Sequence, residues 1–119
     1  MQVAYWIIAG LLAVLYLYSG VLKITRSKDQ LRPMMQWVDD MPLGAIRAIG
    51  VLEVLGAIGL ILPPLLGILP WLAFAAAIGL TLLQVGAIIV HVRRHDTIWL
   101  NLGVIVLSTV AVWLATIWL

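Results

Sequence analysis

Few side chains in this sequence can do chemistry, and most of those that can stand within long apolar stretches. Glu53 and Gln84 are each flanked by leucine, valine and glycine. An ionisable group in hydrocarbon is costly, and such groups usually face the interior of a helix bundle, where they bind protons, ions or ligands. The candidate ligand-binding residues are therefore the polar side chains within or beside these stretches: Tyr16, Ser19, Lys23, Glu53, Gln84, His91 and Asn101.

Helical spacing would bring these residues together. Tyr16, Ser19 and Lys23 recur at intervals of three and four, so they share one face of a helix. Glu53 would lie roughly 12 Å inside its own helix, and Gln84 at a similar depth. Four helices would each turn a polar or small stripe inwards. The pattern predicts a polar pocket in one leaflet, centred on Glu53 with Lys23 as its partner.

Each candidate also has a purely structural interpretation. Glu53 could be a buried carboxyl that is paired or kept neutral by desolvation, and Lys23 could extend to the lipid headgroups. Gln84 and Asn101 could be hydrogen-bonding links between helices. His91 could be an interfacial histidine. Tyr16 could be a packing residue. The convergence of the set on one depth favours the pocket over these separate explanations.

Several kinds of chemistry are excluded or disfavoured. The chain has no cysteine, which removes disulfides, thiol redox chemistry, iron–sulfur clusters and thiolate zinc sites. His91, His95 and Asp96 are close in sequence but form a weak metal pattern, so we expect no metal site. Two histidines on one helix cannot sandwich a haem from opposite faces. No glycine-rich nucleotide loop or nucleophile motif occurs, and no catalytic residue is identified.

The elements that must position these residues are membrane-spanning helices. The chain of 119 residues is 65% hydrophobic and 10% charged, whereas soluble domains carry about 25% charged residues. Four stretches are long enough to cross a bilayer, at about residues 3–22, 45–62, 70–91 and 98–119, the second stopped by Pro63 and Pro64. We predict an all-α membrane protein, a four-transmembrane-helix bundle forming a single domain over residues 1–119.

The loop over residues 23–44 is the longest predicted connection. Within it, Pro33–Met41 could form a short helix on the membrane surface with Met34, Trp37, Val38 and Met41 facing lipid, or an ordinary loop. Aromatic belts mark membrane boundaries, with Tyr5, Trp6, Trp71 and Trp118 expected at one and Trp37 and Trp99 at the other. No chemistry is assigned to these tryptophans.

The basic residues fix an expected orientation. All seven lie in or beside the first and third loops: Lys23, Arg26, Lys28, Arg32, Arg47, Arg93 and Arg94. The positive-inside rule then places both loops in the cytoplasm and both termini outside a cell membrane. Anionic lipid accounts for this charge, so no nucleic-acid partner is expected. Any homo-oligomer should be parallel, because an inverted copy would carry its cations across the membrane.

Three runs in order resemble the DoxX-like membrane proteins. Ser19–Ile24 carries Gly20 and Lys23 at the end of the first helix, Ile49–Pro63 carries Gly50, Glu53, Gly56 and Ala57 in the second, and Leu82–His91 closes the third with His91. The resemblance covers nearly the whole chain. It implies a four-helix bundle and a link to membrane redox complexes, with quinone as a possible cofactor and redox-complex subunits as possible partners.

Three functions stay open. The first is a binding or accessory subunit of a quinone-linked membrane redox system, with the polar inner-leaflet pocket as its site. The second is a small proton- or substrate-coupled transporter. Small multidrug transporters of this size have their glutamate in the first helix and balanced loop charges, unlike this chain. The third is a membrane enzyme acting on a lipid-soluble substrate, for which no reaction is indicated.

The orientation can be tested with reporters at the C-terminus. A phosphatase fusion should be active and a fluorescent-protein fusion dark, because the positive-inside rule places that end outside. A strongly fluorescent C-terminal fusion would contradict the predicted topology.

Overall fold

The computed structural model describes residues 1–33 and 35–119. Four long helices cross its length, α1 (Gln2–Thr25), α3 (Leu43–Leu66), α4 (Leu72–Arg93) and α5 (Trp99–Ala115), the last continued by the 3-10 turn η2 (Thr116–Trp118). Between α1 and α3 lie two short helices, α2 (Lys28–Leu31) and η1 (Gln36–Asp40). The described residues form no strand. Four helices are long and apolar enough to span a membrane, which confirms the predicted all-α four-helix architecture.

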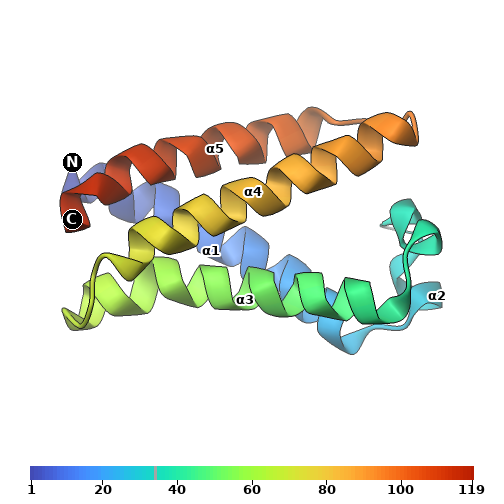
Figure 1. The fold of residues 1–119 in the computed structure, drawn as a ribbon, viewed down its shortest axis with the longest axis horizontal. Coiled ribbons are helices and arrows are strands. Elements are labelled where there is room, and N and C mark those ends of the chain that lie inside the picture. The colour runs from blue at the N-terminus through green and yellow to red at the C-terminus, as the bar shows by residue number, and fades with distance from the viewer. Residues whose placement is uncertain (34) are drawn as a thin grey trace.

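The helices form a closed ring. α1 packs against α3 and α5, and α4 packs against the same two neighbours. Figure 1 shows both termini and the α3–α4 turn at one end of the bundle, with α2, η1 and the α4–α5 turn at the other. The second group carries the basic residues, so we name it the basic end and the opposite one the apolar end. This arrangement places Lys23, His91 and the loop at the same end.

The outer surface of the ring is apolar. Large side chains such as Val14, Leu82, Leu100 and Trp113 are more than 60% exposed. Only 22–28% of each spanning segment is buried within the protein. Exposure of such a large apolar surface to water is unfavourable. Helices whose backbone hydrogen bonds are all formed internally are stable in the lipid interior. The narrow buried stripe of each helix is therefore the part that determines the packing.

The prediction that prolines stop the second span was wrong. α3 runs through Pro63 and Pro64 and ends at Gly67, whose φ of 70° is left-handed. Proline in a last turn costs little where the carbonyl it leaves unpaired finds another donor. Pro64 has no N–H to offer the Leu60 carbonyl, and the buried Tyr5 hydroxyl donates to that oxygen over 2.6 Å.

Tyr5 therefore lies in the core rather than in the predicted aromatic belt, with no exposed surface. Its ring packs edge-to-face against Trp6 and Trp118, with centroids 5.4 Å away in both cases. This aromatic cluster joins the beginning of α1 to the turn after α5 and closes the ring of helices at the apolar end.

α1 and α3 cross in close backbone contact at Gly20 and Gly50. A Cβ atom built on Gly20 would lie 2.7 Å from the Gly50 carbonyl oxygen, and one on Gly50 would lie 2.8 Å from the Gly20 carbonyl oxygen. Those distances are shorter than van der Waals contact, and the obstacle is backbone. Small residues at such crossings let membrane helices approach closely.

Alanine substitution tests this crossing, with another helical glycine as the control. Gly20→Ala should destabilise the protein by about 1–3 kcal/mol, because the added methyl overpacks a rigid contact. Gly10→Ala should be neutral or mildly stabilising, because nothing lies within 4 Å of its added Cβ. Unfolding in detergent micelles, followed by circular dichroism, measures both. Equal stability of the two variants would contradict the close crossing.

Candidate functional site

A buried ion pair flanks the glycine crossing. Because α1 and α3 run in opposite directions, Lys23 lies one turn from Gly20 on the side of the basic end, and Glu53 lies one turn from Gly50 on the other side. Lys23 packs over Gly50 and Glu53 over Gly20, so the close approach of the backbones brings the two side chains together. The Lys23 ammonium donates a hydrogen bond to a Glu53 carboxylate oxygen. Only 10% and 5% of the two side chains are exposed. Lys23 is thus the partner that the sequence predicts for Glu53.

Two further groups surround Lys23. Its Nζ lies 5.4 Å from the centroid of the Trp37 ring, within range of a cation–π interaction. The Arg47 guanidinium donates to the Lys23 carbonyl oxygen over 2.6 Å, which places a cation at the C-terminus of α1, where the helix dipole favours it. The aromatic belt expected at Trp37 does not predict this contact. The position of Trp37 in the polar loop that follows Lys23 was the available signal.

Tyr16 and Gln84 form hydrogen bonds between helices other than the α1–α3 pair. The Tyr16 hydroxyl lies 3.1 Å from the Ser108 hydroxyl and donates to the Leu80 carbonyl over 3.4 Å. The Gln84 amide donates to the Asn101 backbone carbonyl over 3.4 Å. Tyr16, Gln84 and Ser108 are all buried. These contacts act as the interhelical links that the structural interpretation expected, and Ser108 joins the polar set although it was not a candidate.

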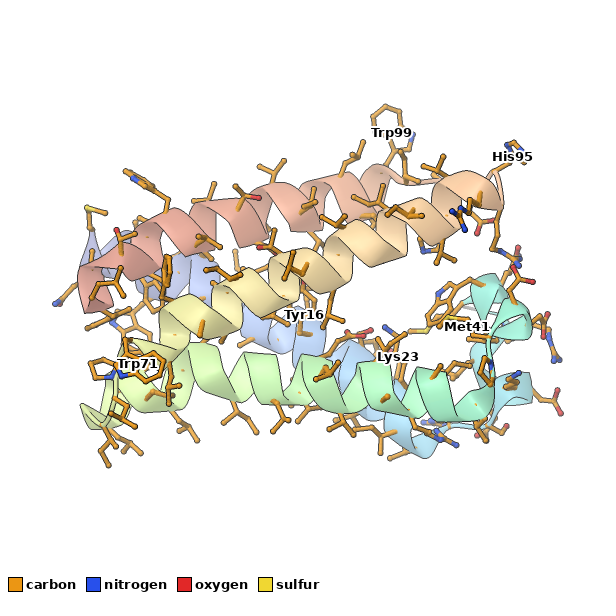
Figure 2. The ribbon with its side chains drawn as sticks, viewed as in Figure 1. Tyr16, Lys23, Met41, Trp71, His95 and Trp99 are labelled. Atoms are coloured by element: carbon orange, nitrogen blue, oxygen red, sulfur yellow. The ribbon has the colours of Figure 1, made fainter. Side chains whose placement is uncertain are left out.

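The remaining candidates do not join this interior set directly. His91 contacts Asp96, with Nδ1 and Oδ2 separated by 3.1 Å. Asn101 contributes its backbone carbonyl and not its side chain. The Ser19 hydroxyl makes no hydrogen bond to the described residues and is partly exposed. Figure 2 shows Lys23 close to Met41 near the basic end, with Tyr16 further towards the middle of the bundle.

Ion pairs at the surface of the basic end form a second polar group. Asp96 accepts from Arg94 over 3.1 Å in addition to its contact with His91. The hydrogen bond with His91, followed by that with Arg94, holds the pKa of the Asp96 carboxyl below its ordinary value. Arg94 also donates to Asp40 on η1. In the described part of the chain, no three histidine or carboxylate side chains gather as potential metal ligands.

Two grooves in the described part of the chain are lined by residues other than Lys23 and Glu53. One, of about 630 Å³, lies between α3 and α4 and is lined by leucine, alanine, glycine and proline. The other, of about 510 Å³, lies at the basic end and is lined by Arg32, Arg94 and neighbouring polar residues. Because only 10% and 5% of the Lys23 and Glu53 side chains are exposed, the ion pair is buried, and a ligand would reach it only after side chains move.

Four apolar helices of spanning length around a buried ion pair define a multi-pass membrane protein of the four-helix class. The profile of the DoxX-like family matches residues 7–115, so the chain belongs to the DoxX-like family. Comparison with curated proteins and with solved structures gave no match. The resemblance seen in the sequence is thereby confirmed.

A double-mutant cycle tests the ion pair. Glu53→Leu should destabilise the protein by about 3 kcal/mol or more, because it leaves a buried ammonium without a partner. The combined change Lys23→Met and Glu53→Leu should recover most of that loss, since packed apolar residues can replace a buried pair at little cost. Unfolding free energies in detergent provide the measurement. Additive effects of the two substitutions would show that Lys23 and Glu53 do not interact.

Proposed function

We propose that this DoxX-like protein is a binding or accessory subunit that holds the polar head of an amphipathic molecule at Lys23 and Glu53. The supporting observation is the burial of both charged groups in an apolar bundle. Packing alone does not require such a pair, since apolar residues of similar volume often stabilise a protein equally well. Ionisable groups placed in spanning helices usually mark ligand or ion sites.

A quinone-like head suits the chemistry of the pair. The Lys23 ammonium is a donor and the Glu53 carboxylate is an acceptor. A quinone carbonyl needs a donor and a quinol hydroxyl needs an acceptor, so the pair can bind both redox forms. Tyr16 and Gln84 would contact other parts of the ring. Ser19, His91 and Asn101 make no side-chain hydrogen bond to this set among the described residues, so only a larger head would reach them. The proposed link to a membrane redox complex follows from the family resemblance.

The proposed location is a cell membrane with the basic end in the cytoplasm, because every basic residue stands at that end. The site would then open to the inner leaflet. A parallel homo-oligomer keeps all copies of the site in that leaflet.

Binding of a photoreactive ubiquinone analogue to the protein in lipid nanodiscs tests the proposal. Glu53→Gln should keep the fold and weaken binding about tenfold or more, the effect of losing one charge-assisted hydrogen bond. Asp29→Asn is the matched control, because the Asp29 side chain is 87% exposed and pairs only with Arg32. It should bind as the unaltered protein does. Undiminished labelling of Glu53→Gln would contradict the proposal.

A further inference from the structure

The short helix η1 packs against α2 and α3, and its Trp37 lies beside Lys23. In the surface helix considered for Pro33–Met41, Trp37, Val38 and Met41 were expected to face lipid. Met34, the fourth residue of that expected face, lies outside the described residues. Val38 is instead fully buried and packs with Leu31 and Ile46, and Met41 packs against this cluster. The prediction of a lipid-facing helix was therefore wrong, because these apolar side chains find a partner in the first turn of α3.

η1 lies over the basic end of the bundle interior. α3 and α4 are in close contact where a Cβ on Gly56 or Gly59 would overlap α4 side chains. Figure 1 shows the two helices diverging from there towards the basic end, where η1 lies. Trp37 extends from η1 to the Lys23 ammonium. The Trp37 ring therefore lies against the Lys23 ammonium, and only 10% and 5% of the Lys23 and Glu53 side chains are exposed.

An ion pair ties η1 to the opposite half of the ring. Asp40, the last residue of η1, accepts from Arg94 in the connection between α4 and α5. The side chains of Asp40 and Arg94 are 54% and 24% exposed. A pair so exposed contributes little to stability and is screened by salt. It can therefore break and re-form without unfolding the bundle.

We propose that η1 is the gate of the Lys23–Glu53 site, with Trp37 as its movable wall and the Asp40–Arg94 pair as its latch. When the latch breaks, Trp37 leaves Lys23 and the ion pair becomes accessible from the aqueous interface. The Trp37 ring also indicates the class of ligand that the site would admit, and this part of the inference rests on the proposed function. A flat conjugated ring can lie against the indole face as the Lys23 ammonium does.

Zero-length cross-linking measures access to the pair without any ligand. A carbodiimide activates the Glu53 carboxyl, and the Lys23 amine attacks it to form an amide. The carboxyl oxygen leaves on the reagent as a urea, and the joined peptides are identified by mass spectrometry. A water-soluble carbodiimide reports access from the aqueous side, and dicyclohexylcarbodiimide, which enters from lipid, reports whether the pair itself is intact.

Asp40→Ala and Trp37→Ala should each raise the rate of cross-linking by the water-soluble reagent, by about two- to fivefold for the latch, the range expected for one exposed ion pair. The matched controls are Asp29→Ala, which breaks an ion pair within the loop, and Trp99→Ala, which removes a ring that is 78% exposed. Both controls should cross-link at the original rate. Added salt should speed the reaction of the unaltered protein but not of Asp40→Ala.

Three results would overturn the gate. These are unchanged rates in Asp40→Ala and Trp37→Ala, equal increases in the controls, or an equal increase with dicyclohexylcarbodiimide, which would indicate a loosened pair rather than an opened path. Absence of the cross-link with both reagents would contradict the Lys23–Glu53 ion pair itself, and with it the gate. Because no quinone is present, failure of this test is distinct from failure of the quinone-binding test.

Discussion

A charge in hydrocarbon has to be neutralised where it stands, and the contact between Lys23 and Glu53 meets that requirement inside this bundle. The pair sets the distance between α1 and α3, and that distance is reached only because Gly20 and Gly50 have no side chains to keep the backbones apart. The same geometry places Arg47 where it donates to the Lys23 carbonyl in the last turn of α1. At this point of the fold the ion pair can form only if the two helices pack closely, so helix packing and electrostatics depend on each other.

Backbone groups obey the same rule as charges. The Leu60 carbonyl, left without a helical donor by Pro64, receives the Tyr5 hydroxyl. Thr81 and Thr109 donate to carbonyls four residues earlier, so their hydroxyls are satisfied within their own helices. Since lipid offers no hydrogen bonds, these polar groups depend on partners in the protein. Tyr5 and Tyr16 of α1 supply such partners to carbonyls on α3 and α4.

Sequence periodicity predicted the four spans and the Lys23–Glu53 pair because both depend on regular spacing along helices. It failed where the outcome depends on tertiary partners. Nothing near Pro64 in the sequence indicates that a tyrosine on another helix will satisfy the Leu60 carbonyl. Likewise, the amphipathic spacing of Trp37 and Val38 shows that a face is apolar without showing what covers it. Helical spacing places His91 with the interior set, whereas in the structure it contacts Asp96 in the connection after α4.

The distribution of charge along the bundle axis makes the molecule vectorial. Every lysine, arginine, histidine, aspartate and glutamate of the chain belongs to the basic end or to the half of the bundle beside it. A change of ionic strength on that side of the bilayer acts on the Asp40–Arg94 and Arg94–Asp96 ion pairs. The same change on the other side meets no lysine, arginine, histidine, aspartate or glutamate side chain. The protein should therefore respond differently to the same change in the two aqueous compartments, even though apolar side chains cover it along its length.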